Sequence, residues 1–466
     1  MRFNISPVKL LPLALVALAF VVTGCPHNDY TVELKPQGAV MERTVTFFKA
    51  DGTGSNGVPN YQAFNQQELA LIAGLYPTNG LTNDGEQHIV RGQFTSAMPG
   101  DVGGAGVYTN LTTSLGAAGF YAERFRGNDD LAGMSEKRLA AAGQLTDLVV
   151  GWSEKELGRE NGYGQLHQFL DVDFRRDLKN LSAYWWEGQM INAYKTNASE
   201  EFIVRFAQYL QERGYFKLGE IPKVVGEFSR NDSSALFSRM QRLVAGKMGV
   251  PESAPVPAAL AFLADDQLME KSFTNYLAST DGYRARLKQW EEDVKSNPDA
   301  KRPDPWVVAE EPATMLLAFE FNLLGATPDH LAVKLSLPAA PLHSNGRWDE
   351  SIKQEVWETD IEGRTNATSP PFSCYASWVQ ADAAFQTEHL GKVAVSGDEL
   401  VQYSLWRSGL EAKQGVEWDA FLARLQPGEA LVGKIDAFRF SGEEVTNSIV
   451  SNSSASARDL LKGALK

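Results

Sequence analysis

The chain has few residues of the kinds that familiar catalytic mechanisms require. Its 466 residues include two cysteines and six histidines. The sequence holds no HExxH pair, no Cys/His cluster, no phosphate-binding P-loop and no GxSxG nucleophile elbow. We therefore expect no metal site and no cofactor, and the absence of these motifs favours a role other than catalysis.

One glycine-rich motif, Gly52 to Gly57, has the GxGxxG spacing of dinucleotide-binding sites. Such a site needs a helix that begins at the third glycine, because the helix N-terminus faces the pyrophosphate. Val58 and Pro59 follow instead, and the first helical pattern begins near Gln66. The motif therefore predicts a loop rather than a cofactor site.

Basic residues are also scarce, with 44 Lys and Arg against 58 Asp and Glu. Residues 1–24 contain Arg2 and Lys9 and no acidic residue, so their removal takes the formal charge from −14 to −16. This charge argues against nucleic acid as a partner, because phosphates are bound by Lys and Arg. It also predicts no electrostatic attraction of the body to anionic lipid.

Long apolar runs are missing from the body of the chain. The only marked run, Leu10 to Val22, is shorter than the roughly 20 residues that a spanning helix needs. Arg2 and Lys9 precede it, and two small residues, Thr23 and Gly24, follow it. A positive head, an apolar run and small residues at its end predict a secretory signal peptide at 1–24.

The stretch Val22-Thr23-Gly24-Cys25 resembles the lipobox of bacterial lipoproteins, over the first 25 residues only. The resemblance implies cleavage before Cys25, a diacylglycerol thioether on its sulfur and an acylated N-terminus, with chains such as palmitate. Two or more acyl chains hold a protein stably on a membrane. The resemblance thus implies a cell-envelope protein, anchored to the inner or outer membrane with its body outside the cytoplasm. A secretory signal with a chance cysteine is the alternative.

Cys374 is the second cysteine, and lipidation of Cys25 would leave it without an intrachain disulfide partner. Its neighbours Phe372, Tyr375 and Trp378 are aromatic. A lone cysteine in an apolar stretch is typical of a small core residue.

The spacing of apolar residues predicts an α+β fold that is mainly helical, with an N-terminal β-rich part and a mixed C-terminal part. The alternating stretches predict strands at 30–34, 41–47, 88–95, 105–113 and 331–337. Apolar stripes at helical spacing predict helices at 135–157, 163–185, 232–248, 258–278 and 282–295, and one that begins at Ser199. Shorter helices are expected at 376–386, 397–408 and 416–425, with a closing strand at 430–440.

These patterns divide the chain into five parts. The signal peptide at 1–24 is followed by a β-rich membrane-proximal part at 25–127, a helical domain at 128–305, a mixed part at 306–446, and a Ser/Asn-rich tail with a short helix at 447–466. Four residues separate Cys25 from the strand that begins at Tyr30, and four residues span at most about 14 Å. We therefore expect the β-rich part to lie against the membrane and the helical region to face the aqueous space.

The most polar helix face combines His167, Asp171 and Arg175, at spacings of four, with Asp173 close by. If this face lined a cleft, the imidazole and the carboxylates of Asp171 and Asp173 would suit acid–base chemistry. The favoured interpretation is a solvated helix flank, held by ion pairs four residues apart.

Two further candidates concern ligand binding. Arg124 and Arg126 lie where the β-rich part meets the helical part, and on one strand face they would suit an anionic group. The alternative is a salt-bridge network between the two parts, with a helix cap at Asn128. Trp186 leaves the apolar stripe of its helix, so its ring is the candidate for stacking on a sugar.

The sequence favours a lipid-anchored bacterial cell-envelope protein that acts in structure or in binding a ligand or partner. The expected partners are the membrane, through the N-terminal lipid, and an envelope protein, a glycan or another solute, and not nucleic acid. The alternative function is an envelope hydrolase, directed at a glycan, that uses helix-borne carboxylates such as Asp171 and Asp173.

Overall fold

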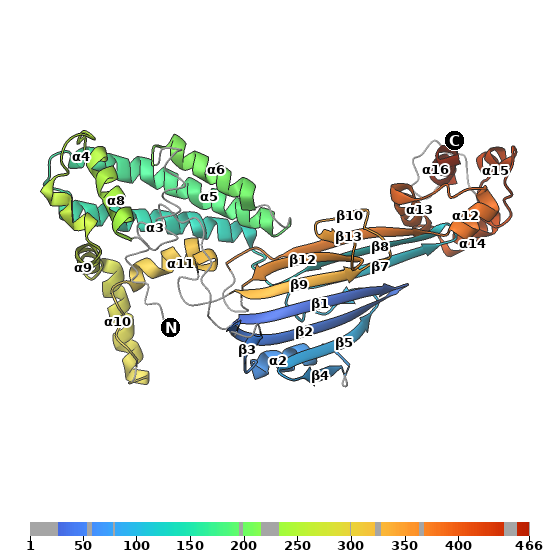
Figure 1. The fold of residues 1–466 in the computed structure, drawn as a ribbon, viewed down its shortest axis with the longest axis horizontal. Helices are drawn as coiled ribbons and strands as arrows, with labels where there is room; N and C mark the ends of the chain where they lie inside the picture. Colours follow the sequence, from blue (N-terminus) through green and yellow to red (C-terminus); the bar gives the residue numbers. More distant parts are fainter. Residues whose placement is uncertain are drawn as a thin grey trace.

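The computed structural model describes residues 27–53, 58–77, 80–194, 199–215, 233–298, 300–321, 328–362, 368–441 and 454–465. The described chain has a mixed α+β architecture, which confirms the expected fold class at that level. Two sheets form the middle of the molecule, a large helical lobe lies at one end of them, and a small helical lobe lies at the other (Figure 1). Cys25 and the rest of the lipobox lie outside the described residues, as do residues 54–57 of the glycine motif.

The first two strands, β1 (His27–Gln37) and β2 (Val40–Thr53), contain the predicted strands at 30–34 and 41–47 and pair as an antiparallel hairpin. Val32 and Leu34 point into the core while Glu33 and Lys35 are exposed, which is the period of two that the sequence shows. Gly38 in the turn has a φ of 59°, a conformation that glycine adopts without steric strain.

The larger sheet has the order β11-β12-β9-β1-β2-β5-β4, with β3 paired to β2 outside this path. Its other strands are β3 (Pro59–Gln62), β4 (Leu81–Asp84), β5 (Gln87–Phe94), β9 (Asp329–Ser336), β11 (Arg347–Asp349) and β12 (Gln354–Ile361). The smaller sheet has the order β10-β13-β8-β7-β6. Its strands are β6 (Ala97–Met98), β7 (Ala105–Thr113), β8 (Gly116–Arg124), β10 (His343–Ser344) and β13 (Ser373–Ala381).

Strands from both ends of the chain share these sheets. β1 pairs in parallel with β9, and β8 pairs antiparallel with β13. The segments 27–124 and 329–381, which the sequence places in separate parts, are therefore joined by backbone hydrogen bonds. The helical lobe between them is an insertion into one two-sheet unit.

Two local predictions in the C-terminal part are wrong. The stretch 376–386, expected as a helix, contains the end of strand β13 and the start of α12 (Ala383–Leu390), which is capped by Asp382. Pairing with β8 fixes β13 as a strand, and its alternate residues Cys374 and Ala376 are buried. The closing strand expected at 430–440 is instead α15 (Leu431–Ala437), whose buried Leu431 and Ile435 are four residues apart.

The two sheets pack face to face over a core that takes large side chains from both. Tyr30 and Trp357 come from the larger sheet and Tyr108 and Tyr121 from the smaller one, and all four are at most 1% exposed. Cys374 lies in the same core, as predicted, and burial raises the pKa of its thiol well above the ordinary value.

A buried ion network crosses this core. The Arg43 guanidinium of β2 donates to both carboxylate oxygens of Asp101, at 2.6 and 2.8 Å, and to both of Glu123 in β8, at 2.8 and 2.9 Å. The hydroxyl of Tyr76 donates to Asp101, and that of Tyr121 donates to Glu123 at 2.6 Å. The network thereby connects the larger sheet to the smaller one through charged groups that water does not reach.

The charges of the Arg43 network do not balance, because one guanidinium faces two carboxylates. Burial raises the pKa of Glu123 above its ordinary value of 4.5, and the nearby Asp101 raises it further, while Arg43 opposes both effects. Desolvation of a charge costs several kcal/mol, so such a network is tolerable only when every member has partners.

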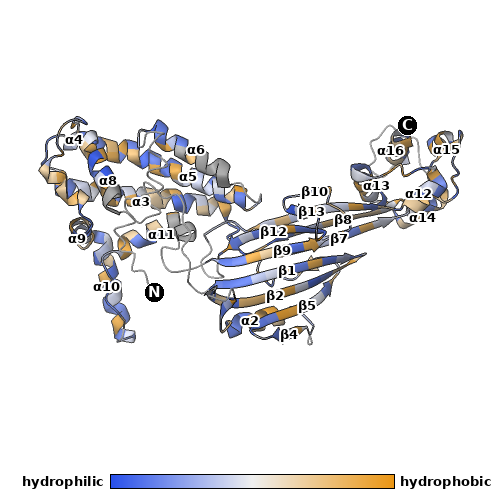
Figure 2. Cartoon of the chain, in the orientation of Figure 1, coloured by the Kyte–Doolittle hydropathy of each residue, from blue (hydrophilic) through white to orange (hydrophobic). Residues whose placement is uncertain are grey.

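The helical lobe contains the predicted helices and one that was not predicted, α11. Its elements are α3 (Leu131–Leu157), α4 (Tyr163–Gln168), the π-helical turn η2 (Phe169–Phe174), α5 (Arg175–Asn192), α6 (Ser199–Glu212), α8 (Ser233–Lys247), the 3₁₀-helix η4 (Ala258–Ala264), α9 (Asp266–Leu277), α10 (Asp281–Ser296) and α11 (Val307–Phe321). Hydrophobic and hydrophilic residues occur side by side along these helices (Figure 2), as in amphipathic helices that pack on one another.

The C-terminal lobe is built from α12, α13 (Gly397–Ser408), α14 (Ala412–Leu422), α15 and α16 (Ser454–Leu465). Gln386 joins it to the sheets, since its amide nitrogen donates to the carbonyls of Leu115 and Val395. Trp418 and Tyr403 fill its core and share a hydrogen bond of 2.8 Å. Short α2 (Gln66–Ala73), capped by Asn65, belongs to the sheet region instead.

The start of β1 lies beside the helical lobe. The Asn28 backbone nitrogen donates to Asp329 at the start of β9, at 2.8 Å, and Arg126, just before α3, pairs with the same carboxylate at 2.9 Å. His27 therefore lies where the chain enters and leaves the helical lobe. The expectation that the helical region faces the aqueous space stays a prediction, because Cys25 lies outside the described residues. Among the described helices, none combines the length and apolar character needed to cross a bilayer.

Replacing Arg43 by Met should lower the free energy of unfolding by about 3–5 kcal/mol, because two buried carboxylates lose their cation. Arg91→Met on β5 is the matched control, since Arg91 is exposed, and should change stability by no more than about 0.5 kcal/mol. Urea denaturation of both variants measures the difference. Equal stability of the two variants would show that the network does not hold the sheets together.

Candidate functional site

The polar face around His167 and Asp171 is divided in the structure. Arg175 donates to Asp171 at 2.7 Å and also pairs with Asp147 of α3 at 2.7 Å. His167 instead packs edge-on against Tyr163, with ring centroids 5.9 Å apart. The predicted Asp171–Arg175 pair is present, and the Asp171 side chain is 45% exposed. The three groups do not converge on one point.

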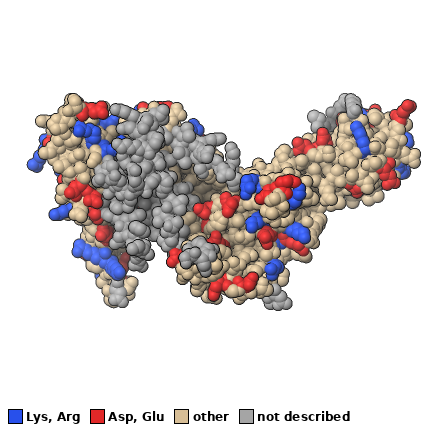
Figure 3. Space-filling model, viewed as in Figure 1, with Lys and Arg blue, Asp and Glu red and all other residues tan. Residues whose placement is uncertain are grey.

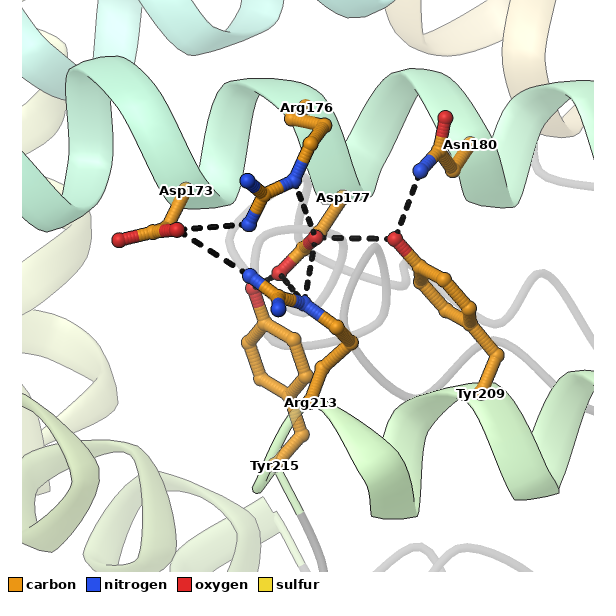
Figure 4. Close-up of polar contacts among 7 residues, drawn as sticks. All are labelled: Asp173, Arg176, Asp177, Asn180, Tyr209, Arg213 and Tyr215. Carbon is orange, nitrogen blue, oxygen red and sulfur yellow. Dashed lines mark hydrogen bonds and ion pairs between the residues drawn. The ribbon is translucent and has the colours of Figure 1, made fainter.

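A second carboxylate on the same helix, Asp177, is buried and surrounded by donors (Figure 4). Its oxygens accept from the hydroxyls of Tyr209 at 2.9 Å and Tyr215 at 3.0 Å. Arg213 donates through Nε at 2.9 and 3.0 Å, and Arg176 lies at 3.4 Å. Tyr209, Arg213 and Tyr215 come from α6 and the residues after it, so Asp177 joins that segment to α5.

Asp173 belongs to the same network. Its carboxylate accepts from Arg176 at 2.6 Å and from Arg213 at 3.1 Å, and Figure 4 shows both guanidinium groups between the two acids. Acid–base chemistry needs a carboxylate with an open position for a substrate proton. Here each acid is held by arginines, which is the arrangement of a structural ion network.

Tyr215 connects this network to a cavity in the helical lobe. Burial raises the pKa of its hydroxyl, which therefore stays protonated and donates to Asp177. Its ring lines the cavity, with its centroid 6.2 Å from that of Phe169. The polar end of Tyr215 thus points out of the cavity and the aromatic end forms part of its wall.

The cavity has a volume of about 80 Å³ and an almost entirely apolar wall. Its lining residues come from α3, α4, η2, α8 and η4, together with Tyr215: Val149, Trp152, Ser153, Leu157, Leu166, Phe169, Leu170, Phe174, Met240, Leu243, Val244, Lys247, Phe262 and Leu263. Apolar pockets with a few polar groups are the usual form of small-molecule sites. Among the features of the described chain, this cavity is therefore the candidate site.

The π-helical turn η2 shapes one wall of the cavity. An α-helix turns residues five apart by about 140° around its axis. The i→i+5 hydrogen bonds of a π-helix bring such residues close to one face instead. Phe169 and Phe174 accordingly both line the cavity, with ring centroids 6.4 Å apart. The sequence predicts one continuous helix here and does not reveal the change of pitch.

Lys247, in the last turn of α8, is the charged residue of the lining. Its ammonium lies 4.2 Å from the centroid of the Phe169 ring, a cation–π contact. Within the described part of the chain, no carboxylate lies within ion-pair distance of this ammonium. The cavity therefore has an apolar interior, and the positive charge on its wall has no ion-pair partner among the residues that the structure describes.

The other ligand-binding candidates lie elsewhere. Arg124 is about half exposed and pairs with Asp129 at 3.1 Å. Arg126 is buried, pairs with Asp329 at 2.9 Å and stacks over the ring of Tyr30. The two arginines thus do not share a face, and their pairs match the alternative of a salt-bridge network.

Trp186 is 4% exposed, and the Arg138 guanidinium lies 4.9 Å from its ring. A buried ring leaves no open face for a sugar in this arrangement.

The N-cap of α3 also differs from the expected one. It is Asp130, whose carboxylate accepts from the Gly133 backbone nitrogen, rather than Asn128.

One signal for the Asp177 network is present in the sequence. Asp177 lies three residues after Phe174 and four before Leu181, both buried, so it occupies an apolar-stripe position. A charge at such a position indicates a buried ion pair. No comparable signal marks the cavity, because its walls are ordinary apolar residues from segments far apart in the sequence.

Comparison of the chain with protein-family models, with curated proteins and with solved structures finds no match in any of the three. Within the described ranges, no group of three His, Cys, Asp or Glu side chains is arranged to hold a metal ion. Acidic and basic side chains are intermixed over the coloured part of the face in Figure 3. The candidate site is therefore interpreted from its own geometry.

Replacing Asp177 by Ala should lower the free energy of unfolding by about 2–4 kcal/mol, because two tyrosines and Arg213 lose a buried acceptor. Asp171→Ala, six residues away on a half-exposed flank, is the matched control and should cost less than about 1 kcal/mol. Thermal or urea unfolding measures both. A larger loss for Asp171 than for Asp177 would contradict this assignment of the two carboxylates.

Proposed function

We propose that the chain is a lipid-anchored protein of the bacterial cell envelope that binds a ligand without transforming it, and that the ligand enters the cavity of the helical lobe. The anchor is Cys25, which would hold the body outside the cytoplasm on the inner or outer membrane. In this proposal the chain is mainly helical: the N-terminal β-rich part carries the tether, the helical domain carries the binding site, and the mixed C-terminal part completes the sheets.

The cavity is the observation that carries the binding function. Unfilled space in a core lowers the free energy of unfolding by roughly 24 cal/mol per Å³. The cavity of about 80 Å³ beside η2 therefore makes the protein about 2 kcal/mol less stable than it would be with that space filled. Larger side chains at Val244 or Leu166 would recover part of that loss. A ligand that fills the space offsets the same loss when it binds.

The carboxylates support binding over hydrolysis. Asp171 and Asp173, the acids on which a hydrolase was hypothesised, are paired with Arg175 and Arg176 at 2.7 and 2.6 Å. Neither acid is among the residues that line the cavity. Ion-paired carboxylates outside a pocket are suited to holding helices together.

The anchor is tested by growing cells with a labelled fatty acid. The wild-type protein should carry the label and the Cys25→Ser variant should not, because the sulfur that bears the diacylglycerol is gone. Cys374→Ser is the matched control: it also removes one thiol, but from a buried core position, and it should keep the label. Equal labelling of wild type and Cys25→Ser would overturn the anchor.

The cavity is tested on the purified Cys25→Ser body with octanol, an uncharged apolar ligand. A ligand that binds only the folded state raises the melting temperature, so octanol should raise that of the body. Val244→Phe fills the cavity and should abolish the shift, whereas Val432→Phe, at a 43% exposed position of α15, should keep it. An equal shift in all three proteins, or none in any, would contradict binding in the cavity.

A further inference from the structure

We infer that the ligand of this cavity is a single-chain amphiphile with one negative charge, such as a long-chain carboxylate, and that Lys247 binds its head group. This inference rests on the proposed function, because it names the chemical class that the same cavity takes. It follows from three properties of the described lining residues: one cation without an ion-pair partner among the described residues, no other polar side chain that lacks a hydrogen-bond partner, and an almost entirely apolar wall.

The cation of the lining is Lys247. Its ammonium makes a cation–π contact with Phe169, 4.2 Å from the ring centroid, and has no ion-pair partner among the described residues. A cation–π contact leaves the ammonium hydrogens that point away from the ring able to donate to an anion. A single ammonium balances one negative charge, which matches a carboxylate better than a doubly charged phosphate.

The other polar side chains of the lining already have partners. Ser153 donates to the carbonyl of Val150 at 2.8 Å, and the Trp152 indole donates to Ser272 at 2.8 Å. The Tyr215 hydroxyl donates to Asp177. A ligand with hydroxyl or amide groups along its length would bury them against apolar walls without partners, which is unfavourable. The sugar or solute expected from the sequence is therefore a poor fit, and a chain with a single polar end is a good one.

The volume limits the shape of the ligand. An apolar cavity of about 150 Å³ accommodates benzene, whereas this cavity offers about 80 Å³. The end of an unbranched alkyl chain suits so small an apolar space, because the rest of the chain and its head group can extend toward the opening. Each methylene group that leaves water makes a favourable contribution, so several of them provide a useful affinity.

The test compares octanoate with octanol, which share a chain and differ in the charged head group. Binding of both to the Cys25→Ser body is measured by calorimetry at neutral pH, for the parent and for Lys247→Met, Lys247→Arg and Lys288→Met. Met keeps the unbranched side chain of lysine without its charge, Arg keeps the charge, and Lys288 is an exposed lysine of α10 in the same lobe.

Lys247→Met should weaken octanoate binding by roughly fivefold, the usual size for a partly exposed ion pair, and leave octanol binding within about twofold. Lys247→Arg should restore octanoate binding, and Lys288→Met should not change it. If octanol binds but octanoate is indifferent to the Lys247→Met change, the head-group assignment is wrong and the cavity remains a site for apolar ligands. If neither compound binds, the proposed function fails with it.

Discussion

The pairing of Arg43 with Asp101 and Glu123 is the interaction on which the sheet region depends. It joins strands that lie 80 residues apart in the sequence and belong to different sheets. Hydrophobic burial alone is non-directional and would allow the two sheets to slide. A guanidinium that donates to two carboxylates in fixed geometry allows only one register. Removing three charged groups from water costs free energy and opposes this stabilisation. The hydroxyls of Tyr76 and Tyr121 reduce the cost by donating hydrogen bonds to the two carboxylates.

Local sequence patterns predict the elements of this fold better than they predict its connections. The alternation of Met41, Arg43 and Val45 places all three on the inward face of a strand, and the structure buries all three. Nothing in the alternation indicates that β1 pairs with β9, about 300 residues later. That pairing depends on long-range contacts, which the period of apolar residues does not encode. The same limit explains why β13 was expected as a helix: its strand conformation is fixed by β8.

The candidate site shows this limit more strongly than the fold. His167, Asp171 and Asp173 attract attention in the sequence because they are polar and regularly spaced, and the structure places them on a flank of the helix. The cavity next to them is built from Phe169, Phe174 and other apolar residues that any packed helix could contain. Its space comes from the π-helical pitch of η2 and from the approach of α8, and both are three-dimensional properties.

The two lobes lie at opposite ends of the sheets, and the described chain begins near one of them. His27 lies at the junction of the sheets and the helical lobe, next to Asn28, which donates to Asp329, whereas the C-terminal lobe packs on the opposite end (Figure 1). Strand β1 has 11 residues, which at about 3.3 Å each separate the two ends by roughly 36 Å. If Cys25 carries lipid, the helical lobe adjoins the membrane and the C-terminal lobe extends toward the aqueous space. This order would suit the proposed acyl ligand, because alkyl chains partition into the bilayer rather than into water, so the lobe with the cavity would be the one nearer to the source of such chains.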